Sequence, residues 1–198
     1  QKLEQYQKQN QLKGPMHYPT HSLSGPLTVM KTRPLKVCCW GEGPYSDDSY
    51  FDDNAFSNET ALFKMANGTT MRIGEFREIS MGRETFRVYG TEGSFENMSW
   101  ISHDGKIELK PEDMRDPLPE EVKEAWRNTE TDSVDYGGHG GSHAYLVNEF
   151  VNAIYQDRTP AISVWEAVRF MAAGVMAHKS ALKDGELLEI PDWGDPQR

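Results

Sequence analysis

Residues 60–77, which read TALFKMANGTTMRIGEFR, decide the fold of this chain. Two runs of apolar and β-branched residues flank Asn67-Gly68, and Asn-Gly is favoured in two-residue hairpin turns because both of its residues tolerate a positive φ. The stretch therefore predicts an antiparallel β-hairpin with a type I′ turn. Apolar side chains occur on both faces of its strands, so we also expect a second copy of the protein to cover the sheet face that helices leave open.

Further short strands are predicted on both sides of this hairpin. One precedes it at residues 35–40, and others follow it at 84–89, 94–96, 100–101 and 107–109. Tight turns at residues 91–93 and 103–105 join the later strands. Strands joined by tight turns pair in antiparallel fashion, so the sequence predicts an antiparallel meander of about six strands within an α+β fold.

Helical periodicity predicts the remaining elements. Helices are expected at residues 18–30, 120–126, 142–157 and 164–184, with the tail of another at 1–12 and a last strand at 187–190. The last helix begins with the capping box Ser163-x-x-Glu166 and ends at Gly185. Two helices carry apolar stripes that we expect to be buried: Leu146, Val147, Phe150, Val151 and Ile154 in one, and Val164, Val168, Met171, Ala172 and Val175 in the other.

Length and charge limit the class of protein. The chain has 198 residues, enough for one domain with a core, and a formal net charge of −10, which argues against a nucleic acid or an anionic membrane surface as partner. No apolar run approaches the roughly 18 residues of a membrane span, so we expect a soluble protein of the cytoplasm or periplasm.

Cys38 and Cys39 are adjacent, a spacing that rarely forms a disulfide. The chain begins without Met or a targeting segment, so we expect the C-terminal part of a longer protein.

The segment His17-Tyr18-Pro19-Thr20-His21 carries three side chains that can handle a proton. If it is helical from His17 onward, the two imidazoles share one face. Histidine titrates near neutrality, so an imidazole in a cleft can transfer a proton at working pH. Two alternatives remain open: ordinary histidines beside a turn, and a zinc site, which needs a third ligand.

A second candidate segment, YGGHGGSH at residues 136–143, is rich in glycine. Its glycines allow a sharp bend or a close approach to a ligand. It is not the GxGxxG pattern of a dinucleotide-binding loop, and no strand of that kind precedes it. His139 and Tyr136 are predicted to reach a cleft and contact substrate, and a structural role in the bend is the alternative.

Residues 15–22 resemble a motif of the glucose-fructose oxidoreductase/inositol dehydrogenase (Gfo/Idh/MocA) family. The usual pattern there is Asp-x-Gly-x-His, and its His is the catalytic acid or base beside the nicotinamide. The resemblance places His21 on the catalytic His, His17 on the Asp and Pro19 on the Gly. It therefore implies a catalytic role for His21 and a substrate-binding role for His17.

The variant Tyr-Pro-Thr-His at residues 18–21 also resembles a branch of this family that uses NAD in a redox-assisted cleavage of glycosides. In that branch the Tyr and the His both line the site, which implies a catalytic role for Tyr18. Ser24 falls where many members have a second Asp that contacts substrate hydroxyls, so the resemblance also implies substrate binding by Ser24.

The order of elements resembles the second domain of the same family. That domain is an open, mainly antiparallel β-sheet with helices packed on one face, as in dihydrodipicolinate reductase. The resemblance implies the tail of an interdomain helix at residues 1–13, a substrate-binding and oligomerisation domain at 14–194, and a C-terminal tail at 195–198. The family's Rossmann domain, with its glycine-rich loop and Glu-Lys-Pro motif, has no counterpart in this sequence.

Three functions follow as hypotheses. The first is the substrate-binding domain of an oxidoreductase that acts on a sugar or polyol with NAD or NADP, the cofactor being bound mainly by the missing domain. The second is an NAD-dependent glycosidase of the same family, and the third is a carbohydrate-binding or assembly module without catalysis. We expect a homo-oligomer, no metal, no cofactor-binding residue in this chain, and no activity of the chain by itself.

Overall fold

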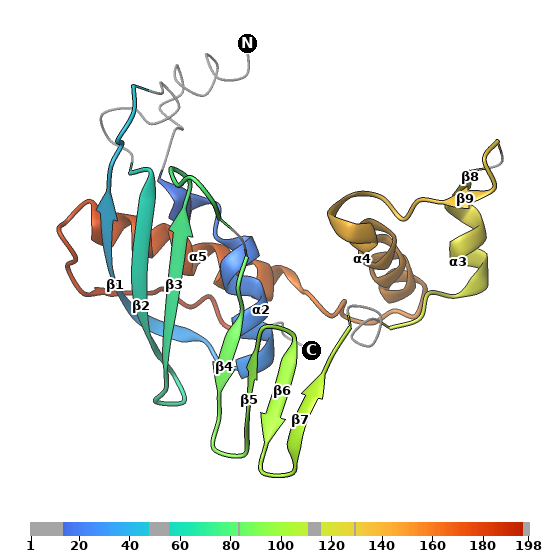
Figure 1. Cartoon of the computed structure of the whole chain (residues 1–198), viewed down its shortest axis with the longest axis horizontal. Helices are drawn as coiled ribbons and strands as arrows, with labels where there is room; N and C mark the ends of the chain where they lie inside the picture. Colours follow the sequence, from blue (N-terminus) through green and yellow to red (C-terminus); the bar gives the residue numbers. More distant parts are fainter. Residues whose placement is uncertain (1–13, 48–55, 83, 111–115, 129, 196–198) are drawn as a thin grey trace. The chain divides into compact units, whose positions relative to one another are not determined.

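The computed structural model describes residues 14–47, 56–82, 84–110, 116–128 and 130–195, and the chain divides into two compact units (Figure 1). One unit runs to Val88 and resumes at Val164, and the other runs from Tyr89 to Ser163. The predicted α+β class, with antiparallel sheets and helices packed on one face, is confirmed. The helix tail predicted at residues 1–12 lies outside the described residues, and the predicted domain limits stay a prediction.

The first unit is built on a four-stranded sheet in the order β10-β1-β2-β3. Its strands are β1 (Pro34–Glu42), β2 (Asn58–Met65), β3 (Thr70–Phe76) and β10 (Leu188–Glu189), all antiparallel to their neighbours. The strands expected at 35–40, 60–77 and 187–190 are therefore confirmed. Side chains alternate along β2, with Phe63 buried and Leu62 exposed, as the two-residue period of a strand requires.

The turn of the β2–β3 hairpin differs from the prediction. The amide of Gly68 donates to the carbonyl of Met65 (3.0 Å), so Ala66 and Asn67 are the central residues of the turn. Of the Asn-Gly pair, only Gly68 has a positive φ (87°), whereas a type I′ turn needs one at both residues. The prediction of a type I′ turn is therefore wrong. The turn contains one more residue than expected, and Gly68 is the residue that leads the chain into β3.

Two helices cover one face of this sheet. They are α2 (Thr20–Met30) and α5 (Val164–Ala181), and Figure 1 shows α5 crossing behind β1–β3 with α2 beside it. The buried apolar side chains between helices and strands form one cluster: Met16, Leu23, Leu27, Val37, Cys39, Ala61, Phe63, Met65, Met71, Ile73, Phe170, Ala172, Ala173, Ala177, Ala181 and Ile190. As predicted, α5 is followed by Gly185, whose φ is 81° and whose amide donates to the carbonyl of Ser180.

The buried face of α5 is not the predicted one. Of the five residues expected in the core, only Ala172 is buried, whereas Val164 is 62% exposed and Met171 is 37% exposed. The helix instead buries Phe170 and several small residues, among them Ala173, Gly174 and Ala177, which let its backbone come close to the sheet. An open groove of about 480 Å³ is lined by Val168, Met171, Val175 and Met176 of α5, with Trp193.

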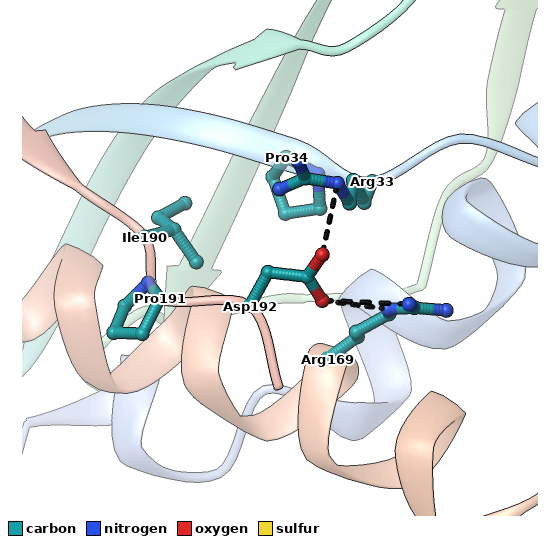
Figure 2. Close-up of a pocket in the computed structure, with 6 residues that line it drawn as sticks. All are labelled: Arg33, Pro34, Arg169, Ile190, Pro191 and Asp192. Carbon is teal, nitrogen blue, oxygen red and sulfur yellow. Dashed lines mark hydrogen bonds and ion pairs between the residues drawn. The ribbon is translucent and has the colours of Figure 1, made fainter. Parts of the chain in front are cut away.

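An ion-pair network holds the segment after β10 against α5 (Figure 2). The carboxylate of Asp192 lies 3.2 Å from Nε of Arg33 and 3.4 Å from the guanidinium of Arg169. Arg169 also pairs with Glu166 of its own helix (2.9 Å) and with Asp195 (2.7 Å). The network therefore joins the start of β1, the middle of α5 and the C-terminal segment.

The later strands begin where the chain passes from the first unit to the second, a boundary that falls after Val88 in β4 (Arg87–Tyr89). β4, β5 (Gly93–Glu96), β6 (Ser99–Ser102) and β7 (Gly105–Glu108) form a separate four-stranded sheet in that order. The prediction of a single meander is therefore wrong, because β3 and β4 are not hydrogen-bonded to each other and belong to separate sheets. A short helix, α3 (Glu120–Ala125), confirms the expected one, and β8 (Arg127–Asn128) pairs with β9 (Ser133–Val134).

The last helix of this unit, α4 (Gly138–Tyr155), contains non-helical residues at 139–141 and is regular after them. Its predicted buried stripe is wrong, because Leu146, Val147, Phe150, Val151 and Ile154 are all exposed, by 52–66%. The sequence places these side chains on one face of a helix, but burial also needs a second surface to cover that face. Ala144 and Ala153 are the buried side chains of α4.

Within the described part of the chain, none of the helices has the length and apolar character that crossing a membrane requires.

Candidate active site

The candidate site begins on a 3₁₀ turn, η1 (Pro15–His17), just before α2. The amide of Tyr18 donates to the carbonyl of Pro15 (2.9 Å) and closes this turn. Pro19 then occupies the N-cap of α2, and the amide of Leu23 donates to its carbonyl (2.9 Å). The helix thus begins at Thr20, so the two histidines of the segment lie on different elements and do not share one helix face.

The two predicted catalytic residues, Tyr18 and His21, lie side by side. Their ring centroids are 5.4 Å apart, with a tilt of 36° between the ring planes. Tyr18 is 60% exposed, and His21 is exposed on the first turn of α2. A phenol and an imidazole that are both open to solvent can bind the same small molecule from one side.

The two predicted substrate-binding residues of the same segment have other contacts. The ring of half-buried His17 lies edge to face with His178 of α5, with centroids 4.6 Å apart. The hydroxyl of Ser24 donates to the carbonyl of Thr20 (2.5 Å), one turn earlier in α2. His17 therefore contacts the protein interior, and Ser24 has only its oxygen lone pairs left for a substrate hydroxyl.

A buried polar pair lies beneath this segment. Nδ1 of His178 lies 2.7 Å from Oε1 of Glu59, and the side chains are 2% and 0% exposed. The second carboxylate oxygen, Oε2, accepts the amide of Met16 (2.6 Å). Among the described residues, Nε2 of His178 is buried without a hydrogen-bond partner.

Sequence reasoning missed Glu59 and His178, although both carry a signal. Glu59 falls on the inward phase of β2, two residues before Ala61, so the strand period places its carboxylate in the core. His178 lies one turn of helix after Gly174, on the small-residue face of α5. A charged residue in the phase of a buried stripe indicates a buried polar contact.

Two glycines allow the segment to lie this close to its neighbours. A Cβ at Gly174 would overlap the carbonyl oxygen of Met16 and the ring of Pro19. A Cβ at Gly14 would come within 2.7 Å of both Glu59 Oε2 and His178 Nδ1. Substitution at either position would displace the start of the site segment.

The carboxylate of Glu59 also acts on Cys39. Burial, and then the negative charge of Glu59, raise the pKa of the Cys39 thiol from 9.0 to about 12. Cys39 is a fully buried free thiol on β1.

The remaining site predictions, His139 and Tyr136, belong to the second unit. Residues 139–141 form a left-handed turn, with φ values of 55°, 66° and 91°. The ring of exposed His139 lies 5.8 Å from that of His143, whose Nδ1 accepts the amide of Gly138 (3.1 Å). Tyr136 is half-buried, and its carbonyl accepts the amide of Ala144.

These residues do not fit the phosphates of a dinucleotide. The glycine-rich turn follows β9, a strand of two residues, and lacks the strand-turn-helix geometry of a Rossmann loop. As for the zinc alternative, the described residues contain no group of three His, Cys, Asp or Glu side chains placed to hold a metal ion.

Comparison with solved structures finds the same fold in parts of larger oxidoreductases. An aldose-aldose oxidoreductase from Caulobacter crescentus has a TM-score of 0.61 at 12% identity, over 87% of this chain and 46% of that one. A UDP-N-acetylglucosamine 3-dehydrogenase from Acidithiobacillus ferrooxidans has a TM-score of 0.56 at 15% identity, over 81% and 45%. A myo-inositol 2-dehydrogenase from Lactobacillus plantarum has a TM-score of 0.52 at 14% identity, over 84% and 46%.

Sequence comparison gives the family. The family model described as glycosyl hydrolase 109, C-terminal domain, matches residues 58–197. A glycosyl hydrolase family 109 protein from Parabacteroides distasonis is 25% identical over 68% of this chain and 29% of its own length. One from Stenotrophomonas maltophilia is 27% identical over 59% of this chain and 25% of its own length. The match to this chain thus spans less than a third of these relatives. This chain belongs to glycosyl hydrolase family 109, of which it carries the C-terminal domain.

Proposed function

We propose that the protein containing this domain is an NAD-dependent glycosidase, and that the domain binds the sugar and supplies the proton-handling groups. The pairing of Tyr18 with His21 on an exposed turn, in a domain of family 109, carries this proposal. Both residues are part of the Tyr-Pro-Thr-His variant, which resembles the glycoside-cleaving branch. The family model begins at residue 58, so it supports the proposal independently of that segment.

In this proposal, a sugar carbon is oxidised transiently so that the glycosidic bond can be cleaved. His21 takes the proton of a substrate hydroxyl while the carbon that bears this hydroxyl gives up a hydride. Tyr18 donates a hydrogen bond to the same oxygen as it becomes a carbonyl. NAD supplies the hydride acceptor when bound, and we propose that residues outside this chain hold most of it.

The oxygen of Ser24, one turn after Thr20 in α2, is a proposed sugar contact. His17 is included through its exposed part, although its ring also packs against His178. These side chains can hydrogen-bond sugar hydroxyls without a full charge, unlike the carboxylates found at these two positions in the resembling family. Substrate binding by His139 and Tyr136 of the second unit stays a separate prediction from the sequence.

The deciding experiment is a panel of nitrophenyl glycosides offered to the full-length protein with NAD present. We expect release of free sugar and nitrophenol without net formation of NADH, because the hydride returns to the sugar within each turnover. The isolated domain is expected to be inactive. Turnover by the isolated domain, or hydrolysis that persists after NAD is removed, would contradict the proposal.

Two substitutions test the roles of the paired residues. His21→Gln is expected to lower kcat by roughly 10²–10⁴-fold, because it removes the base, and Tyr18→Phe by roughly 10²-fold, because it removes one donor to the developing negative charge. Ser22→Ala is the matched control, since its hydroxyl donates to the carbonyl of Pro19 within the same turn. A loss of activity in the control equal to that in Tyr18→Phe would remove the phenol from the mechanism.

A second candidate function is net oxidation of a sugar or polyol. The solved structures with this fold favour it, since they include sugar and inositol dehydrogenases. Accumulation of one NADH per substrate consumed, with no glycosidic bond cleaved, would support this candidate over the glycosidase.

We also propose that the full-length protein is a homo-oligomer built through the open face of the first sheet. Trp40, Leu62 and Phe76 are 51%, 47% and 45% exposed, and the last two lie on β2 and β3, on the face opposite the helices. A second copy of this face would remove these apolar side chains from water.

A further inference from the structure

The buried pair of Glu59 and His178 is costly if it serves stability alone. Removing a carboxylate and an imidazole from water carries a desolvation penalty, and apolar residues of similar volume often stabilise a core at least as well. Most of the buried side chains of this unit form an apolar cluster, and Nε2 of His178 has no hydrogen-bond partner among the described residues. A contribution to stability therefore does not explain why Glu59 and His178 are buried together, and their polar contacts indicate a further role.

Two contacts of the pair are made with η1, the turn that directly precedes Tyr18. Oε2 of Glu59 accepts the amide of Met16 (2.6 Å), in the middle of η1. Oε1 of Glu59 holds Nδ1 of His178 (2.7 Å), and the His178 ring packs edge to face against His17 (4.6 Å between centroids). Two different contacts, a backbone hydrogen bond and a ring contact, thus tie η1 to β2 and α5.

Tyr18 follows His17 directly, and His21 lies on the first turn of α2 after it. The backbone between them has little freedom, because Pro19 fixes its own φ and sits fully buried against α5. A rotation of η1 would therefore move the phenol and the imidazole together.

We propose that Glu59 and His178 are positioning residues, which hold η1 so that Tyr18 and His21 meet the substrate in a productive orientation. The inference rests on the proposed function, because it assumes that Tyr18 and His21 handle the substrate proton. It goes beyond that function, because it assigns a role to two buried residues that handle no substrate proton themselves.

The first test measures the turn itself, by amide hydrogen exchange in the full-length protein. Glu59→Gln keeps the side-chain shape but replaces one of the two accepting oxygens by an NH₂ group. The side chain then has one oxygen where Met16 and His178 now each contact their own. We expect exchange at Met16 to accelerate by more than tenfold relative to the core strands. Ser180→Ala is the matched control, since this buried α5 hydroxyl donates to the carbonyl of Glu186 and accepts the amide of Cys39, away from η1.

Unchanged relative exchange at Met16 in Glu59→Gln would overturn the proposal, whatever the protein's activity. This readout separates the two hypotheses: if no substrate of the panel is turned over, the proposed function fails, while the exchange result still tests the positioning of the turn.

The second test compares kinetics. Glu59→Gln and His178→Gln are each expected to lower kcat by about 10- to 100-fold with little change in KM, because substrate contacts remain while the reacting groups are misplaced. The double variant should be no slower than the worse single variant, since the pair acts as a unit. A kcat equal to that of Ser180→Ala, or fully additive losses, would overturn the proposal.

A stability-restoring variant covers the case in which the single variants do not fold. Glu59→Met combined with His178→Leu replaces the pair by apolar residues of similar size, which can restore a buried core. The restored protein is expected to remain slow, with fast exchange at Met16. Recovery of wild-type kcat with recovered stability would mean that the pair serves stability alone.

Discussion

At the scale of a single residue, His139 has a backbone conformation that suits glycine. Its φ and ψ are 55° and 45°, in the left-handed region, which costs a non-glycine residue about 1–2 kcal/mol. We expect His139→Gly to raise the free energy of unfolding of its unit by about 1 kcal/mol and to lower catalytic activity. Thermal unfolding and glycosidase assays of the full-length protein measure the two effects.

Asp157 provides the matched control for this prediction. It is exposed in the same unit and has a φ of 49°, so Asp157→Gly should relieve similar strain without changing activity. If His139→Gly kept full activity, the imidazole would have no role in the substrate site, and the left-handed turn would be structural.

Cys39 is predicted to be chemically inert in the folded state. Because burial and Glu59 raise its pKa to about 12, the thiol stays neutral well above the pH at which an ordinary cysteine ionises. Iodoacetamide at pH about 8.5 should modify half-buried Cys38 first and leave Cys39 intact, as read by peptide mass spectrometry. Both should react after unfolding. Equal rates in the folded protein would contradict this environment for Cys39.

The same shift makes stability depend on pH. The folded-state pKa of Cys39 lies above the unfolded one, so its contribution to the free energy of unfolding is complete below the unfolded pKa. That contribution is lost as the pH rises from about 9 towards 12. Cys39→Ala should remove this alkaline dependence from the denaturation profile.

At the scale of elements, the end of α5 depends on Gly185. A Cβ there would overlap the ring of Trp40, and the φ of 81° is itself unfavourable for other residues. Gly185→Ala should lower the free energy of unfolding by about 1–3 kcal/mol more than Gly194→Ala. Gly194 is the control because its φ is 82° but no atom of the described residues lies within 4 Å of the position that a Cβ would take there. If chemical denaturation gave the same loss of unfolding free energy for both variants, the Trp40 ring would move away from a Cβ at position 185 at little cost.

At the scale of the whole molecule, the open sheet face predicts the oligomeric state. Leu62→Glu places a charge among exposed apolar side chains of β2, where burial against a second copy would leave that charge without water. We expect the full-length protein to change from dimer to monomer in sedimentation experiments. Ile107→Glu, on exposed β7 of the second unit, is the control and should leave the dimer intact. A dimer that persists in Leu62→Glu would exclude this face.

Local patterns were enough for much of the fold. The hairpin around Asn67-Gly68 and the glycine that follows the end of α5 depend on residues close in sequence, so the sequence predicts them. The turn type was wrong because the choice between two- and three-residue turns depends on the strand register, which the whole sheet sets. The stripe of α4 was predicted at the correct helical spacing, but its burial was wrong because spacing does not supply a covering surface.

By itself, the sequence determined the α+β class, the positions of most helices and strands, and a candidate site at residues 17–21. The class and the elements follow from side-chain period, turn chemistry and capping, which act over a few residues, while the candidate site follows from its residue types and from the family resemblance. Only the tertiary structure decided which face of α5 is buried, where the strands divide into two sheets, and that Glu59 meets His178. Those outcomes join residues up to 119 positions apart, and they depend on how closely two backbones can approach, which Gly174 allows and no local pattern specifies.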